Sequence, residues 1–330
     1  MSRPGPLRAP LDRPVPGGGP GTAVAVGVFD GVHLGHAAIL ATARAAARGG
    51  RCVVVSFDPH PGVVLARAFH PQPPLTPIPE KRERLAALGI RELEVLPFTR
   101  ELAALEPEDF VARFLVEPHA PRTLVVGEDF TLGRGRSGDV PRLRGIGARA
   151  GFTVEAVPLL QIEGAPVSST RIRGLLAEGR VAEAARLLGR LYDLTGRVVT
   201  GEAIGRTLGY PTANLRPYEE KLVPRHGIYA VWARIAGEPE RRPGAMSIGV
   251  RPTFGGQVRA LEVHLLDWDG DLVGRDVTVE MVEWLRPEYR FDSKEALVEA
   301  MGRDVAEVRR ILGPAAAGPQ PEPTSRKSRS

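Results

Sequence analysis

Cysteine and long apolar runs are nearly absent from this sequence. Cys52 is the only cysteine among 330 residues, which excludes an internal disulfide bond and a metal site built from cysteines. The apolar residues around it favour a buried, unreactive thiol. No apolar run reaches the roughly 18 residues that a membrane-spanning helix needs. Residues 1–21 are rich in proline, glycine and arginine and lack the apolar stretch of a secretory signal, so we expect a flexible leader on a cytoplasmic protein.

Aromatic residues are also scarce, at 5% of the chain. A surface that stacks single-stranded nucleic acid interleaves aromatic with basic side chains, and the formal net charge of +5 comes instead from scattered basic residues. We therefore expect small phosphate-bearing ligands as partners, and neither a nucleic acid nor a membrane. With 43% hydrophobic and 25% charged residues, the composition is that of a soluble globular chain long enough for two domains.

Strand-like and helix-like segments alternate through residues 22–188. Apolar, β-branched runs predict strands at 23–28, 51–57, 92–97, 123–127 and 153–157. Helical periodicity predicts helices at 37–48, 80–88, 108–116 and 141–150, and then two short helices at 170–188 that break at Gly179. This alternation predicts a Rossmann-like α/β domain with a parallel sheet and right-handed crossovers.

The pattern changes after Leu191, which places the domain boundary near residue 189. Short β-rich runs with turn signals between them occur at 192–199, 228–235, 245–250, 260–266 and 276–285. Strands at this spacing predict a small antiparallel β-barrel in residues 189–312, closed by a helix that Ser293 caps at 293–312. Residues 313–330 are expected to be a disordered tail.

Two histidines, His33 and His36, stand at the start of an alanine-rich helix just after the first predicted strand. Residues three apart share a helix face, so the two imidazoles should lie together where a parallel sheet binds ligands. A helix N-terminus also favours anions, which points to phosphate chemistry. A zinc site is a weaker interpretation, because no third ligand has suitable spacing. The glycines of 133–138 match a dinucleotide motif by letter, but they do not follow the first strand.

The surrounding string, G-x-F-D-G-x-H-x-G-H, resembles the nucleotidyltransferase superfamily. It is most similar to the adenylyltransferase half of the bifunctional riboflavin kinase/FMN adenylyltransferases, and motifs in the family's order span roughly residues 24–312. The resemblance implies that His33 and His36 hold phosphate oxygens and that Arg173 holds the leaving pyrophosphate. It further implies that nucleotide or flavin is bound by Gly27, Phe29, Asp30, Gly35, Asp58, Pro59, His60, Asp129, Ser169 and Thr170. Asp30 and Asp129 are alternative carboxylates for steadying Mg²⁺.

A second group of motifs lies in the predicted barrel. The string G-x-P-T-A-N resembles the riboflavin kinase signature, and here Thr212 and Asn214 alternate on an extended chain, so their hard oxygens face one side and suit Mg²⁺. The resemblance implies that Glu262 is the catalytic base, with Leu261 and Val263 turned into the core. It also implies nucleotide or flavin contacts for Gly205, Arg206, Gly209, Pro211, Trp284 and Arg286. Trp284 has an alternative role in packing.

These resemblances imply an enzyme that phosphorylates riboflavin to FMN with ATP and Mg²⁺, and then adenylylates FMN to FAD with release of pyrophosphate. Three alternatives stay open: an adenylyl- or cytidylyltransferase with an unrelated β domain, a flavin-binding regulator without catalysis, and a basic RNA-binding protein. The sequence does not predict the oligomeric state.

Overall fold

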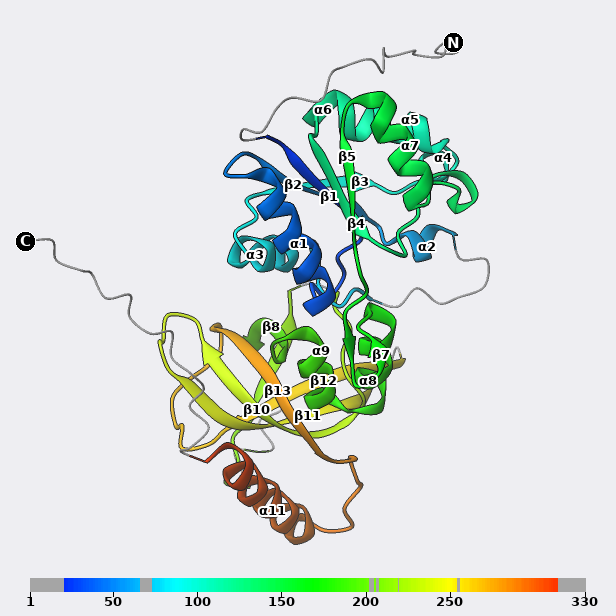
Figure 1. The fold of residues 1–330 in the computed structure, drawn as a ribbon. Helices are drawn as coiled ribbons and strands as arrows, with labels where there is room; N and C mark the ends of the chain where they lie inside the picture. The colour runs from blue at the N-terminus through cyan, green and yellow to red at the C-terminus, as the bar shows by residue number, and fades with distance from the viewer. Residues whose placement is uncertain are drawn as a thin grey trace, which may run out of the picture. The chain divides into compact units, whose positions relative to one another are not determined.

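The computed structural model describes residues 21–65, 73–201, 205, 208–218, 220–253 and 256–313. The chain divides into two compact units, of which the first comprises residues 1–174, 185–190 and 219–222 and the second comprises the remaining residues. Among the helices of the described part, none has the length and apolar character needed to cross a membrane. Each unit is described below by itself (Figure 1).

The first unit is built on a five-stranded parallel sheet with the order β3-β2-β1-β4-β5. The strands are β1 (Ala23–Val26), β2 (Cys52–Asp58), β3 (Glu92–Pro97), β4 (Thr123–Gly127) and β5 (Thr153–Val157). All four residues of the central strand β1 are buried, as expected for a β-branched run covered on both faces. The parallel sheet confirms the predicted α/β fold class. The chain order reverses between β1 and β4, which is where ligands bind in such sheets.

Helices cover both faces of this sheet. On one face lie α1 (Leu34–Ala47) and α3 (Ile78–Ala87), with α5 (Pro107–Val111) and α7 (Val140–Ala150) on the other, as Figure 1 shows. Two buried apolar clusters result, one including Leu40 and Leu85 and the other including Phe110 and Leu143. The smaller elements are α2 (Pro61–Leu65), α4 (Arg100–Ala103), η1 (Ala112–Val116), α6 (Glu117–His119), η2 (Arg134–Arg136), β6 (Gln161–Ile162), β7 (Ala165–Pro166), α8 (Ser169–Glu178) and α9 (Val181–Leu188).

Two predicted helices differ in extent from the structure. The first begins at Leu34 rather than at residue 37, because His33 caps it and brings residues 34–36 into the first turn. The helix predicted at 108–116 is a short α-helix, α5, that continues as a π-helical turn, η1. Cys52, predicted to be buried, is partly buried, and burial raises the pKa of its thiol to about 11.

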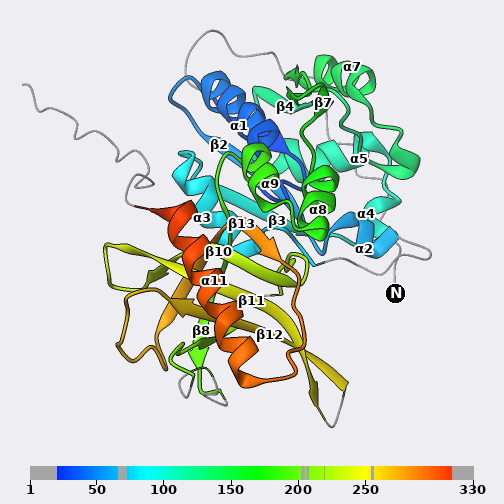
Figure 2. The same ribbon diagram turned by 90° about the horizontal axis from the view of Figure 1, so that it is seen from below.

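The second unit is a closed antiparallel barrel with the order β10-β11-β12-β9-β8-β13. Its strands are β8 (Tyr192–Val199), β9 (Ala213–Pro217), β10 (Gly227–Ile235), β11 (Arg241–Thr253), β12 (Gly256–Leu265) and β13 (Asp276–Arg286). The barrel confirms the predicted architecture, although β9 was not among the predicted strands. The hydroxyl of Ser293 accepts a hydrogen bond from the N–H of Ala296 at 3.1 Å and caps α11 (Lys294–Leu312), as expected. Figure 2 shows α11 lying across the barrel, where Val308 and Leu312 pack on Ala230 and Leu266.

Candidate active sites

The histidine pair lies at the N-terminus of α1. His33 is the N-cap, and its Nδ1 accepts a hydrogen bond from the N–H of His36 at 3.2 Å. The two rings stack with centroids 3.6 Å apart, and Phe29 contacts His36 edge-on at 5.2 Å. Because Nδ1 of His33 accepts, the neutral ring carries its proton on Nε2, which leaves that N–H as a donor. The predicted juxtaposition of the two imidazoles is confirmed, and His33 caps the helix as well.

Burial keeps both rings uncharged. It lowers the pKa of His33 to about 4, against an opposing effect of Asp30 and with a further lowering by Arg190. The pKa of His36 lies well below its usual value because of burial and then because of His33 and Lys81. At neutral pH the pair therefore offers neutral N–H donors, without the cost of a buried charge.

The buried pair makes stability depend on pH. Because the pKa of His33 falls from 6.5 to about 4 on folding, the unfolded chain binds more protons between these values. Stability is therefore fully present above pH 6.5, and on the order of 3 kcal/mol should be lost as pH falls to about 4. We expect His33→Asn, which retains a capping oxygen, to lose less unfolding free energy than the wild type as the pH falls from 6.5 to about 4. Urea unfolding followed by circular dichroism measures this free energy. Replacement of the exposed His226 by Asn is the control, and an equal pH slope in His33→Asn would contradict this account.

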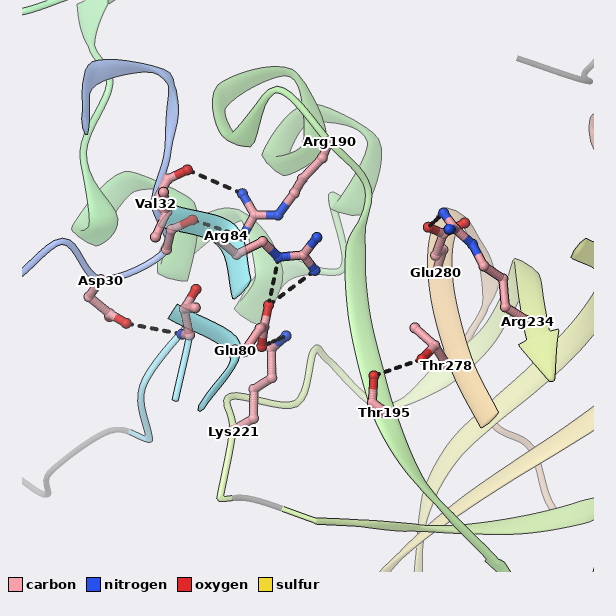
Figure 3. A network of polar contacts seen from close by, with 12 residues as sticks. Asp30, Val32, Glu80, Arg84, Arg190, Thr195, Lys221, Arg234, Thr278 and Glu280 are labelled. Carbon is pink, nitrogen blue, oxygen red and sulfur yellow. Dashed lines mark hydrogen bonds and ion pairs between the residues drawn. The ribbon is translucent and has the colours of Figure 1, made fainter. Parts of the chain in front are cut away.

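The loop before α1 has an unusual backbone that its neighbours fix. Phe29 and Val32 have φ angles of 50° and 40°, a region that costs energy for residues other than glycine. The Arg190 guanidinium donates to the carbonyls of Gly31 and Val32 at 2.9 and 3.3 Å (Figure 3). Arg190 thus holds the strained loop from which His33 emerges. Arg190 was not among the predicted site residues, because no motif near it in the chain indicates this contact.

Asp30 connects its own loop to two other segments of the first unit, residues 75–76 and α8. Its buried carboxylate accepts hydrogen bonds from the N–H groups of Leu75 and Thr76 at 3.2 and 3.0 Å, and it pairs with the Arg173 guanidinium at 2.6 Å (Figure 3 draws Asp30). The Ser169 hydroxyl donates to the Asp30 carbonyl at 2.8 Å. Two predicted site residues, Asp30 and Arg173, are thus brought together, although separate roles on metal and pyrophosphate were expected. This arrangement favours a structural role for Asp30. Asp129 then stays the candidate carboxylate for steadying Mg²⁺.

A cavity of about 280 Å³ opens beside Asp30. The predicted residues Asp58, Pro59 and His60 line it, and His60 Nδ1 accepts from the N–H of Gly62 at 2.9 Å. Lys81, on the inner face of α3, also lines it and was missed by the sequence analysis. Thr170 is exposed at the start of α8. Gly27 and Gly35 leave little room for a side chain, since a Cβ there would lie 3.2 Å from the rings of Phe29 and His33, respectively.

Two neighbouring cavities, of about 400 and 940 Å³, meet at Thr212 and Asn214 in the barrel. Glu262 lines the smaller one, and its carboxylate accepts a hydrogen bond from the Thr212 hydroxyl at 3.1 Å. Leu261 and Val263 are buried, as the predicted alternation requires. Because β9 and β12 place Asn214 opposite Glu262, three oxygen-bearing side chains converge where the cavities join. Hydroxyl, amide and carboxylate oxygens are a donor set that suits Mg²⁺.

Glycines and a proline shape the walls of these cavities. Gly205 borders the smaller cavity, and a Cβ there would lie 2.3 Å from the Tyr210 carbonyl oxygen, so this position requires glycine. Gly209, with φ of 81°, and Pro211 border the larger one. Arg206 lies outside the described residues.

Arg286 forms one wall of the smaller cavity. Its guanidinium donates to both carboxylate oxygens of Asp304 at 2.8 and 2.6 Å and lies near the rings of Tyr289 and Phe291. Trp284 was predicted to contact a cofactor, but it does not line this cavity. It packs against Gly179 and Gly227 with Arg225 over its ring, so the alternative prediction of a packing role fits the structure better.

Loss of the Asp304 charge should disturb this wall. We expect Asp304→Asn to raise the KM for a ligand of the smaller cavity about tenfold, because the bidentate contact that orients Arg286 is lost, and to cost about 1–3 kcal/mol of stability. Glu299→Gln, which removes an exposed ion pair with Arg303 on the same helix, should change neither quantity by much. Equal effects of the two changes on KM and on thermal unfolding would contradict the role given to Asp304.

The comparisons with known proteins match both units. Residues 18–171 match the family model described as FAD synthetase, and residues 188–312 match the model described as riboflavin kinase. A bifunctional riboflavin kinase/FMN adenylyltransferase from Pseudomonas fluorescens is 40% identical, covering 90% of this chain and 94% of its own. The protein of that name from Listeria monocytogenes is 37% identical, covering 87% and 91%. A crystal structure from Streptococcus pneumoniae, named there as a macrolide-efflux protein, has a TM-score of 0.81 and 32% identity, covering 89% of this chain and 95% of that one.

Proposed function

The chain belongs to the family of bifunctional riboflavin kinase/FMN adenylyltransferases, and we propose that its second unit converts riboflavin to FMN and its first unit converts FMN to FAD. The observation that carries this assignment is the convergence of Thr212, Asn214 and Glu262 at the junction of two cavities within the barrel. In the first unit, the stacked His33–His36 pair at a helix N-terminus supports the second reaction.

The kinase reaction follows from the arrangement of oxygens around Glu262. The 5′-hydroxyl of riboflavin attacks the γ-phosphorus of ATP, its proton passes to the Glu262 carboxylate, and ADP leaves. The smaller cavity, walled by Arg286, Tyr289 and Phe291, would hold the flavin, and the larger one would hold the nucleotide. Thr212 and Asn214 would hold Mg²⁺, which would supply positive charge to stabilise the phosphates during transfer.

The adenylyl transfer needs no protein nucleophile. A phosphate oxygen of FMN attacks the α-phosphorus of ATP, and the bond from that phosphorus to the pyrophosphate oxygen breaks. Catalysis then depends on positioning and on donors aimed at the charged oxygens. The N–H groups of His33 and His36 would supply such donors, and the N-terminus of α1 adds its dipole. Ser169 and Thr170, at the start of α8, would contact the triphosphate.

Labelled ATP tests the division between the two units. With riboflavin and γ-labelled ATP, the label should enter FMN and remain in FAD, and with FMN and α-labelled ATP it should enter FAD alone. Label from the α-position in FMN, or no transfer to flavin from either nucleotide, would reject the proposal. Riboflavin, FMN and ATP as small-molecule partners follow from the family. The cytoplasmic location and the absence of nucleic-acid and membrane partners stay predictions of the sequence.

A further inference from the structure

Lys81 is a buried cation in the first unit that the proposed mechanism does not use. It lies on α3, one helical turn before Leu85, and both side chains face inward with exposures of 3% and 1%. A buried ammonium is costly unless hydrogen bonds or opposite charges compensate it. The contacts that compensate the Lys81 ammonium therefore indicate what this side chain does.

The Lys81 ammonium joins the ends of two strands. It donates to the Val28 carbonyl oxygen at 2.8 Å and to the Ser56 hydroxyl at 3.2 Å, and that hydroxyl in turn donates to the same carbonyl at 2.9 Å. Val28 follows β1 and leads into the Phe29–His33 loop and the start of α1, whereas Ser56 lies in β2, which leads to Asp58 and His60. One side chain thus fixes the spacing of the two segments that carry the predicted site residues.

Both acceptors of Lys81 are uncharged, and in the described part of the chain no carboxylate lies within ion-pair distance of it. Two carboxylates raise the pKa of Lys81 against the effect of burial. They are Asp30, which is already paired with Arg173 at 2.6 Å, and the exposed Asp58. The charge of Lys81 therefore affects the protonation of nearby histidines. It lowers the pKa of His36, after burial and His33. It also lowers the pKa of His60, after burial and together with Arg173, against an opposing effect of Asp30.

We propose that Lys81 is a positioning residue for the adenylyl transfer, whose ammonium fixes the ends of β1 and β2 and so holds in place the segment that carries the stacked His33–His36 pair. A proton on His36 would place a cation at a helix N-terminus and against the His33 ring 3.6 Å away. A second proton on Nδ1 of His33 would break its bond to the N–H of His36. Protonation therefore dismantles the donor arrangement, and Lys81 resists it. This inference rests on the proposed function of the first unit.

Two neutral replacements separate charge from hydrogen bonding. Lys81→Gln retains an amide donor, whereas Lys81→Met retains only the length of the side chain. We expect both to raise the pKa of His36 and to move the acid limb of the FMN-to-FAD rate upward in pH, because a nearby positive charge that disfavours protonation is removed. Ser56→Ala keeps the charge, so it should leave the acid limb in place while lowering the rate several-fold.

Lys221→Gln is the matched control. Lys221 is also largely buried and pairs with Glu80 of α3 at 2.6 Å (Figure 3), but it does not line the cavity beside Asp30. The Lys221→Gln substitution should leave both the acid limb of the FMN-to-FAD rate and the titration of His36 unchanged. Riboflavin phosphorylation should be normal in every variant.

Histidine titration by NMR of the whole protein gives a readout that does not depend on catalysis. A His36 titration and an acid limb that both stay unchanged in Lys81→Gln would overturn the proposal and leave Lys81 a structural role. If Lys81→Met fails to fold, Lys81→Gln decides the matter. If the wild type forms no FAD from FMN, the proposed function fails, and the titration of His36 still tests the effect of Lys81.

Discussion

The double substitution His33→Ala and His36→Ala is expected to abolish FAD formation while riboflavin is still phosphorylated at the wild-type rate. In the proposed mechanism each imidazole would offer a donor to phosphate oxygens, and loss of one such preorganised donor costs about 10²–10³-fold in rate. FMN should therefore accumulate in reactions that contain riboflavin and ATP, as measured by chromatography of the flavins.

The control addresses the structural role of His33 as a helix cap. His33→Asn with His36→Gln retains an oxygen that can cap α1 and retains polar side chains, but lacks both imidazoles. It should fold like the wild type and still form no FAD. Normal FAD synthesis by this variant, or loss of FMN formation in either variant, would contradict the assignment of the two reactions to separate units.

Glu262→Gln is expected to have the opposite effect. The amide retains the size of the side chain and a contact with the Thr212 hydroxyl, which lies 3.1 Å away, but it does not take up the riboflavin proton. Loss of a general base lowers rates by about 10²–10⁴-fold, so FMN formation should fall by that factor while FMN is converted to FAD normally. Steady-state kinetics with each flavin as substrate would measure both.

Glu283→Gln is a suitable comparison for Glu262. Glu283 is an exposed carboxylate on another barrel strand, β13, and does not line either cavity of the barrel. Its replacement should leave both reactions unchanged. If Glu262→Gln phosphorylated riboflavin as fast as Glu283→Gln, Glu262 would not be the base.

The central elements of the fold could be predicted because burial leaves a local mark on the sequence. Strand β1 is a continuous apolar run, and its four buried residues have no other interpretation in an α/β chain. Strand β9 leaves a weaker mark. It is five residues long, ends at Pro217 and carries Asn214 and Arg216, so the expected alternation of apolar and polar residues is hard to recognise.

The candidate sites were predictable where a motif is contiguous and not where side chains meet through folding. His33 and His36 lie in one short string, and Thr212 and Asn214 in another. Lys81, Arg190 and Asp304 act on partners more than 15 residues away, and no local pattern marks those contacts. Trp284 shows the reverse case, since an aromatic residue beside a motif packs against glycines and not into the cavity.

The most direct test is a time course of the purified protein with riboflavin, ATP and Mg²⁺, with flavins separated by chromatography. FMN should appear first and FAD should follow, with pyrophosphate released in step with FAD. FMN without FAD, when FMN supplied directly is also not adenylylated, would contradict the role of the first unit. Riboflavin that remains unchanged would contradict the role of the second.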